Sequence, residues 1–264
     1  MSVPVTRRPR RLAPRLAAGL LGVALVALLV LGGEAAVTLR RTFLSADSAP
    51  PATDTAVGEA GQPLVRLVMI GDSTAAGVGA STTSATVGGQ LASALAADSH
   101  RVALSNVAVS GSRASDLAPQ VSRVLLDRPD VAVILIGAND ATHRTGLGSV
   151  RRDVAEAVSR LRRGGIAVVL GTCPDMGAAR AFPQPLRLVV AWQGRRVAAA
   201  ERVVGRAAGA EVVDIGRQTG PAMRADSTTL AGDDFHPSDR GYRLWARALL
   251  PAVRATVARE PGSG

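Results

Sequence analysis

Short apolar runs alternate with amphipathic stretches along most of the chain, beginning near residue 64. The first apolar run, residues 64–70, lies between Pro63 and Gly71, and its length and boundaries are typical of a buried strand. The pattern predicts strands at residues 64–70, 101–109, 130–136, 166–170 and 211–215. It predicts helices at residues 87–97, 113–126, 150–163, 189–208 and 238–259. Five strands alternating with helices favour a parallel sheet covered on both faces, so we expect a doubly wound α/β domain.

A different pattern precedes this domain. Residues 16–33 contain no charged side chain, and a helix of that length is about 27 Å long, just enough to cross the hydrocarbon core of a bilayer. Basic residues beside a membrane span usually stay in the cytoplasm, and five arginines precede this one, at positions 7, 8, 10, 11 and 15. The pattern therefore predicts a basic cytoplasmic segment at residues 1–15, a transmembrane signal anchor at 16–33 and an extracytoplasmic remainder.

The alternative to an anchor is a signal peptide, whose cleavage would release a secreted protein. Signal peptides usually have a shorter apolar core, and no clean Ala-x-Ala cleavage site follows residue 33. We therefore favour an uncleaved anchor that holds the protein at the cell membrane. Residues 34–63 are rich in Pro, Ala, Thr, Asp and Gly and have no periodicity, which is typical of a linker. The globular domain is expected to cover residues 64–260.

Composition narrows the classes of partner and cofactor. The net charge is +10, and all 31 basic residues are arginines. A nucleic-acid surface would need clustered arginines with stacking aromatic side chains, but aromatic residues make up only 2% of the chain. The single cysteine, Cys173, and three scattered histidines do not fit a disulfide framework or a metal site. We expect no nucleic-acid partner, no metal and no cofactor, and we expect Cys173 to be a buried apolar residue.

Four short polar motifs lie in predicted loops. They are residues 71–73 (Gly-Asp-Ser), 110–112 (Ser-Gly-Ser), 137–140 (Gly-Ala-Asn-Asp) and 233–237 (Asp-Asp-Phe-His-Pro). The first three directly follow predicted strands, and the fourth precedes the last helix. Because the carboxyl ends of parallel strands open on one edge of a sheet, these groups can converge although they are far apart in sequence.

The residue types in these motifs suit nucleophilic catalysis. A serine hydroxyl becomes a good nucleophile when an imidazole takes its proton and a carboxylate orients the imidazole, and Ser73, His236 and Asp233 can fill these roles. The backbone N–H groups of Ser73 and Gly111 and the amide of Asn139 can donate to a tetrahedral oxyanion. Gly111 has no Cβ, so its N–H can approach closely.

Each motif also has a plainer interpretation. Asp72 or Ser73 can cap a helix, residues 137–140 can form a turn, and His236 can be a helix-entry residue. Asp234 competes with Asp233 as the acid. Among the remaining candidates we expect loop-bracing roles for Asp72 and Asp140, a solvated loop position for His143, core positions for Tyr242 and Trp245, and pocket positions for Phe182 and Trp192.

Together, the motifs make the sequence resemble the SGNH (GDSL-type) hydrolase family. The resemblance rests on Gly71-Asp72-Ser73, Gly111, Gly137-x-Asn139-Asp140 and Asp233-x-x-His236 and covers about residues 64–258. The first block reads Gly-Asp-Ser-Thr rather than Gly-Asp-Ser-Leu, a change at a position without a chemical role. The resemblance implies a three-layer flavodoxin-like fold, Ser73 as nucleophile, His236 as base with Asp233 as its partner, and an oxyanion hole of Ser73, Gly111 and Asn139.

The expected function is that of an extracytoplasmic serine esterase, which hydrolyses acyl or acetyl esters of a lipid or cell-envelope substrate through an acyl-enzyme. We expect a monomer whose membrane contact is the N-terminal helix. One alternative is an acyltransferase that uses the same three residues to acylate a sugar or lipid. Another is a non-catalytic envelope-binding domain, although the complete set of catalytic residue types argues against it.

Overall fold

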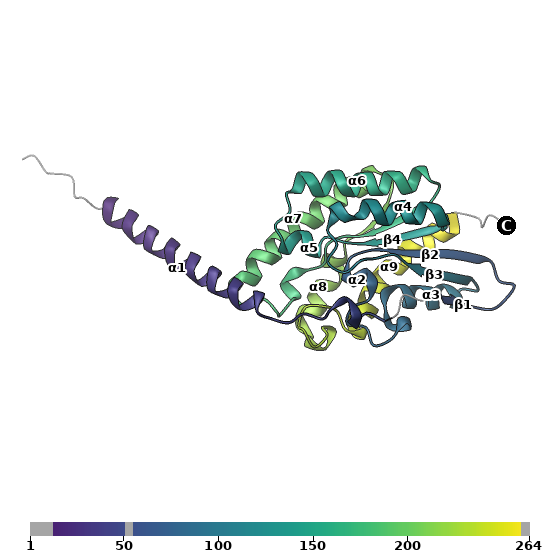
Figure 1. Cartoon of the computed structure of the whole chain (residues 1–264), viewed down its shortest axis with the longest axis horizontal. Helices are drawn as coiled ribbons and strands as arrows, with labels where there is room; N and C mark the ends of the chain where they lie inside the picture. Colours follow the sequence, from purple (N-terminus) through teal and green to yellow (C-terminus); the bar gives the residue numbers. More distant parts are fainter. Residues whose placement is uncertain (1–12, 51–54, 260–264) are drawn as a thin grey trace, which may run out of the picture.

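The computed structural model describes residues 13–50 and 55–259. Within these residues a six-stranded sheet runs through the centre of the domain (Figure 1). Its strands are β1 (Thr55–Val57), β2 (Leu64–Gly71), β3 (Arg101–Asn106), β4 (Val131–Leu135), β5 (Ala167–Gly171) and β6 (Glu211–Val213). Their spatial order is β1-β3-β2-β4-β5-β6, and all neighbouring pairs except β1 and β3 are parallel. The predicted α/β class and its five parallel strands are confirmed.

The sheet is nevertheless mixed, which corrects the prediction of a purely parallel five-stranded sheet. The additional strand, β1, pairs antiparallel with β3, so that Val57 lies opposite Val102. It comes from residues 34–63, which we expected to be a linker. Three residues are too few to produce a detectable hydrophobic period, and this explains why the sequence pattern does not reveal β1.

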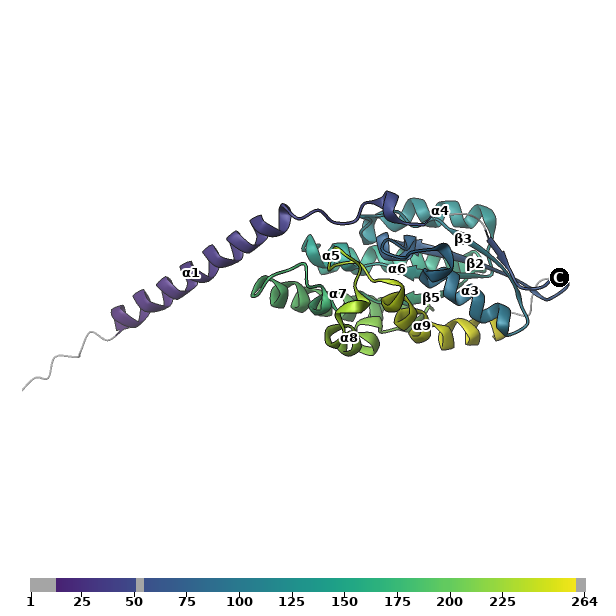
Figure 2. The same cartoon turned by 90° about the horizontal axis from the view of Figure 1, so that it is seen from below.

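Helices cover both faces of the sheet (Figures 1 and 2). On one face lie α3 (Val87–Ala97), α8 (Ile215–Ala225) and α9 (Asp239–Arg259). On the other lie α4 (Leu117–Asp127), α6 (Leu147–Arg163) and α7 (Leu186–Ala207). The short helices α2 (Ser73–Ala76) and α5 (Ala138–Thr142) follow β2 and β4 directly. The sequence pattern does not predict α8, whose continuity is hidden by an internal proline, Pro221.

The central strand β2 explains why the apolar run at residues 64–70 is nearly continuous. Successive side chains of a strand point to opposite faces. Val65, Leu67 and Met69 pack beneath the α3 and α9 layer, whereas Val68 and Ile70 pack beneath α4 and α6. Both faces are buried, so both sets of positions must be apolar.

The N-terminal helix α1 (Ala13–Leu39) projects away from the domain (Figure 1). Its Leu20–Thr38 stretch has a mean hydropathy of 2.3, and none of the apolar window within it is buried. By length and composition α1 is a membrane-span candidate, and an N-terminal signal sequence would have the same properties. The expected anchor at residues 16–33 lies inside α1, whereas most of the expected basic segment at 1–15 lies outside the described residues.

The carboxyl end of α1 is attached to the domain. The Glu34 carboxylate accepts a hydrogen bond from the backbone N–H of Leu186 at 2.7 Å, at the first residue of α7. The first N–H groups of a helix have no partner within that helix. A side chain of α1 therefore satisfies one of these groups in α7 and holds the two helices together at this point.

Candidate active site

The predicted site residues lie at the carboxyl edge of the sheet, where chain segments that are far apart in sequence meet. Ser73 begins α2 immediately after β2, and Asn139 lies in α5 immediately after β4. His236 lies in the loop before α9. The side chains of Ser73 and His236 are buried, with 6% and 4% of the residue surface exposed.

Ser73, His236 and Asp233 form one continuous hydrogen-bonded series. The Ser73 Oγ lies 2.9 Å from His236 Nε2, and His236 Nδ1 lies 2.6 Å from Asp233 Oδ2. An ionised carboxylate only accepts hydrogen bonds, so Nδ1 must carry the proton in this contact. In the neutral ring Nε2 is then the acceptor for the Ser73 hydroxyl. The protons therefore lie on His236 Nδ1 and on the Ser73 hydroxyl, which is the protonation state that serine activation requires.

The two candidate acids differ in their surroundings. Asp233 Oδ1 accepts the backbone N–H groups of Phe235 at 3.0 Å and His236 at 2.9 Å. Asp234 has a left-handed backbone with a φ of +59°, and its half-exposed side chain lies 4.0 Å from the guanidinium of Arg41. Only Asp233 contacts the His236 ring.

The environment of Asp233 keeps its carboxylate ionised. Burial alone would raise the pKa of Asp233. Hydrogen bonds from the His236 ring and from three backbone N–H groups outweigh burial and hold this pKa well below its usual range. The carboxylate thus stays available to orient the imidazole across the neutral pH range.

The turn that presents Ser73 depends on glycine and on a helix cap. Gly71 has a φ of +138°, and a Cβ there would lie 1.7 Å from the carbonyl oxygen of Leu135 on the neighbouring strand, so glycine is required. Asp72 Oδ1 then accepts the backbone N–H of Thr74 at 2.9 Å and its hydroxyl at 2.7 Å. The capping interpretation is therefore correct for Asp72, and it is compatible with a Ser73 side chain that faces His236.

Hydrogen bonds hold the candidate oxyanion-hole groups together. The Asn139 side-chain amide donates to the carbonyl of Ser112 at 3.0 Å, so Asn139 lies against the loop that contains Gly111. Gly111 has a φ of +85° and open space where a Cβ would stand. In the described part of the chain, neither its N–H nor that of Ser73 has a backbone hydrogen-bond partner outside the regular elements. Both N–H groups are thus available to an external acceptor.

Gln120 is a positioning residue that the sequence analysis missed. Its Oε1 accepts the N–H of Gly71 at 2.8 Å, and its Nε2 donates to the Gly71 carbonyl at 3.0 Å and to Ser112 Oγ at 3.1 Å. It therefore ties the loop after β2 to the loop after β3. The sequence carried a signal for it, because Gln120 is a polar residue on the apolar face that Leu117, Val121 and Val124 define at helical spacing.

Three buried carboxyl groups lie behind the carboxyl edge of the sheet. Burial raises the pKa of Asp72 to about 6 and also raises the pKa of Asp140. Asp140 Oδ2 accepts the N–H of Ala114 at 2.9 Å, which is the expected loop-bracing role. Burial raises the pKa of Glu201 on α7 well above its usual range, and Glu201 Oε2 accepts the N–H of Cys173 at 2.6 Å.

The Cys173 thiol is buried, and burial raises its pKa well above the usual range. This fits the expected structural role better than a reactive thiol. Within the described ranges, no three His, Cys, Asp or Glu side chains are grouped so that they could hold a metal ion.

The 41–44 segment, which follows α1, lies against the loop that carries Asp233. The backbone N–H of Leu44 donates to Asp233 Oδ2 at 3.1 Å. The Phe43 ring meets the Phe235 ring edge-on, with centroids 5.2 Å apart, and Phe235 in turn contacts the His236 ring at 4.9 Å. We expected this segment to be part of a linker, because residues 34–63 are rich in Pro, Ala, Thr, Asp and Gly and have no periodicity. A contact made by a backbone N–H does not depend on residue type, so the sequence pattern does not reveal it.

The remaining candidates divide as follows. Tyr242 and Trp245 are buried in the core, as predicted. Phe182 is also buried and meets Phe235 edge-on at 5.8 Å. His143 is exposed, as expected, and its Nδ1 lies 2.9 Å from the Asn139 carbonyl oxygen. Trp192 is half-exposed on α7, where the Arg196 guanidinium lies 4.4 Å from its ring centroid.

A mixed, mostly parallel sheet with this strand order and with helices on both faces is an α/β hydrolase-like fold. Comparison with known families is more specific. The chain belongs to the GDSL-like lipase/acylhydrolase family, whose sequence model matches residues 69–244, and it is a carboxylic ester hydrolase.

Individual relatives agree with this assignment. A GDSL-like esterase of Mycobacterium tuberculosis is 37% identical over 220 residues, which cover 78% of this chain and 70% of the relative. Two solved structures share the fold at lower identity. An alpha/beta hydrolase enzyme from the metagenome of Lake Arreo has a TM-score of 0.59 at 22% identity, over 75% of this chain and 97% of its own. A lipase/acylhydrolase from Enterococcus faecalis has a TM-score of 0.57 at 20% identity, over 72% and 96%.

The contact between Leu44 and Asp233 gives a first prediction. Leu44→Pro removes the N–H donor, whereas Leu44→Ala keeps it and serves as the matched control. Hydrogen bonds to charged groups are worth about 1.5–3 kcal/mol, so we expect Leu44→Pro to lower kcat/KM for p-nitrophenyl acetate by about tenfold and Leu44→Ala to lower it much less. Equal losses in the two variants would contradict a role for the N–H.

The raised pKa of Asp72 gives a second prediction. Its folded-state pKa of about 6 exceeds the unfolded value of 3.8, so folding favours the protonated carboxyl. The free energy of unfolding should therefore fall as pH rises through this interval. Asn cannot ionise, so Asp72→Asn should make this fall in the free energy of unfolding smaller by about 3 kcal/mol. Asp47→Asn, a substitution at an exposed position, serves as the control and should leave the fall unchanged. Denaturant unfolding at pH 4 and pH 8 measures the difference, and parallel profiles for all three proteins would refute the assignment.

Proposed function

We propose that the protein is a membrane-anchored extracytoplasmic serine esterase that cleaves acyl or acetyl esters through a covalent acyl-enzyme on Ser73. The observation that carries the proposal is the short series from Ser73 Oγ through the His236 ring to the Asp233 carboxylate, at 2.9 and 2.6 Å. A buried serine hydroxyl has little reason to lie in line with an oriented imidazole unless its proton is to be removed.

The proposed reaction has two similar halves. His236 Nε2 takes the Ser73 proton as Oγ attacks the ester carbonyl carbon, and the Asp233 carboxylate stabilises the imidazolium through Nδ1–H. The tetrahedral intermediate collapses when the C–O bond to the alcohol breaks and the alcohol oxygen receives the proton from Nε2. Water then attacks the acyl-enzyme with the same base, which releases the acid and restores the Ser73 hydroxyl.

Three donors are proposed for the oxyanion: the backbone N–H groups of Ser73 and Gly111 and the side-chain amide of Asn139. The Asn139 amide has two N–H groups, and one of them is engaged by the Ser112 carbonyl. The other is the proposed donor to the oxyanion. Losing one such donor typically costs about 10²–10³ in kcat.

The proposed location follows from α1 and the residues before it. The arginines at positions 7, 8, 10, 11 and 15 favour a cytoplasmic N-terminus, which would place the domain outside the cell. Because the 41–44 segment follows α1 closely and contacts the Asp233 loop, the site would lie near the membrane surface. This proximity favours esters presented by the membrane or the adjoining envelope as substrates.

Ser73→Ala tests the nucleophile. We expect kcat/KM for p-nitrophenyl acetate and p-nitrophenyl octanoate to fall by about 10³-fold or more, with an unchanged unfolding midpoint. Labelling by a fluorophosphonate probe, which reacts with activated serines, should disappear in the same variant. Turnover or labelling equal to that of the wild type would refute the assignment of Ser73.

Two matched substitutions test the acid. Asp233→Asn keeps the shape of the side chain but removes its charge, and we expect kcat to fall by about 10³–10⁴-fold because the imidazole loses its orienting acceptor. Asp234→Asn removes only a half-exposed ion pair worth at most about 1 kcal/mol, so kcat should stay within about twofold. A larger loss for Asp234→Asn than for Asp233→Asn would reverse the assignment.

A further inference from the structure

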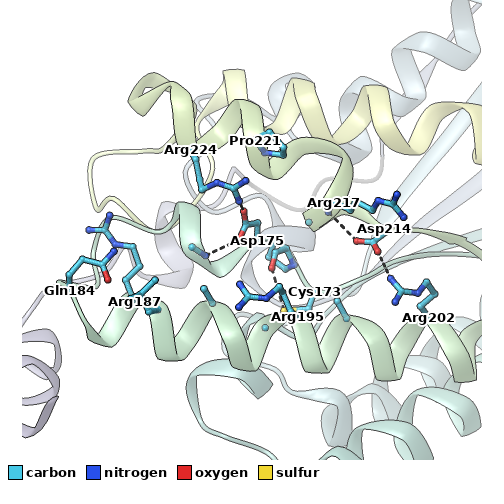
Figure 3. Close-up of a pocket in the computed structure, with 17 residues that line it drawn as sticks. Cys173, Asp175, Gln184, Arg187, Arg195, Arg202, Asp214, Arg217, Pro221 and Arg224 are labelled. Carbon is cyan, nitrogen blue, oxygen red and sulfur yellow. Dashed lines mark hydrogen bonds and ion pairs between the residues drawn. The ribbon is translucent and has the colours of Figure 1, made fainter. Parts of the chain in front are cut away.

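A second concave site lies between α7 and α8, beside the carboxyl ends of β5 and β6 (Figure 3). It is a cleft of about 730 Å³, with the chain that follows β5 as part of its wall, including Cys173 and Pro174. None of the five residues predicted for the ester-hydrolysing site lines it. The roles proposed above for those five residues therefore involve no side chain of this cleft.

The cleft lies between two rows of arginines. Arg187, Arg195 and Arg202 come from α7, and Arg217 and Arg224 come from α8. Intervals of eight and seven residues on α7 keep its three arginines on one face of the helix, and they span about 22 Å along its axis. The two on α8 are seven residues apart and share a face in the same way. Figure 3 places the two groups on opposite sides of the cleft.

The carboxylates in the cleft neutralise only some of these arginines. Asp214 pairs with Arg202, and Asp175 pairs with Arg224, which leaves three cations without a carboxylate. The Arg187 guanidinium donates to backbone carbonyls, including that of Phe182 at 2.7 Å. Among the described residues, the side chains of Arg195 and Arg217 have neither a hydrogen-bond partner nor an ion-pair partner.

Like charges that line one cleft repel one another and together create a local potential that attracts anions. A planar carboxylate is already satisfied by one bidentate arginine. Guanidinium groups that approach from two facing helices instead suit an anion with three or four oxygens around one centre. Phosphate has this shape, and arginine forks match its oxygens in pairs.

We propose that this cleft binds a phosphate group, with Arg195 and Arg217 as the principal donors from its two sides. The group can belong to an anionic phospholipid or to a soluble phosphate. The lipid source has support at one end of the cleft, where Gln184, Arg187 and Leu188 lie next to the contact between α1 and α7. Leu188 is 63% exposed there and could contact an acyl chain or the apolar edge of a headgroup region.

The test uses the full chain in nanodiscs and two double variants of equal charge change. Arg195→Gln with Arg217→Gln removes the two unpaired donors. Arg123→Gln with Arg151→Gln removes two exposed arginines from α4 and α6, away from the cleft. In nanodiscs of phosphatidylcholine, inorganic phosphate is titrated by calorimetry. In a second arm, the unfolding midpoint is compared between phosphatidylglycerol and phosphatidylcholine nanodiscs.

We expect the cleft variant to bind inorganic phosphate at least tenfold more weakly than the wild type, or to lose the stabilisation by phosphatidylglycerol, while the control variant retains both. A loss in the phosphate arm identifies a soluble ligand, and a loss confined to the lipid arm identifies a headgroup. If the cleft and control variants respond alike in both arms, the proposal is wrong.

Hydrolysis of p-nitrophenyl acetate without phosphate should stay within about twofold of wild type in both double variants, which reports that they are folded. Because the binding arms do not depend on Ser73, a failure of the esterase proposal and a failure of this one are distinguishable. Ser73→Ala should bind phosphate and phosphatidylglycerol as the wild type does.

Discussion

Four hydrogen bonds converge on the carboxylate of Asp233, and the candidate active site depends on them. Two come from the backbone of its own loop, one from the His236 ring and one from Leu44 at the other end of the chain. A carboxylate with so many donors stays ionised and has little freedom to rotate. The imidazole is therefore held in one tautomer and one orientation, and the Ser73 hydroxyl meets it at the required atom.

The sheet makes this convergence possible. Ser73 and His236 are 163 positions apart in sequence, and they meet because the parallel strands end at one edge while α9 returns across the sheet. The strands β4 and β5 and the edge-side half of β2 are buried on both faces. Gln120 and Asn139 add local connections between the loops after β2, β3 and β4. The site thus combines long-range placement by the sheet with short-range adjustment by side-chain amides.

Much of this could be predicted from the sequence, because the determining signals are local. Each buried parallel strand is a run of apolar residues, and each polar motif lies next to the end of one. Ser73 and His236 could be named as candidates because activated serines need those residue types, and the resemblance to the SGNH family favoured Asp233 as the acid. The choice between Asp233 and Asp234 required coordinates, since it depends on which carboxylate points to the imidazole.

Other features were hidden for identifiable reasons. The strand β1 is too short to show a period, and the contact of Leu44 is made by a backbone N–H that every residue except proline possesses. Glu201 looks like an ordinary charged position of a helix, although it is fully buried. The arginine cleft joins α7 to α8, and the sequence pattern does not predict α8, so its two rows could not be assembled in advance.

The short connection between α1 and the Asp233 loop has a consequence for how the protein would meet its substrates. Leu44 is only five positions beyond the end of α1 at Leu39, and an extended chain of five residues reaches about 17 Å. If α1 remains in a bilayer, Asp233 cannot rise far above the surface, and the domain cannot swing freely into the surrounding fluid. Encounters would then occur by lateral diffusion within a thin layer, and surface density rather than bulk concentration would set the rate of turnover.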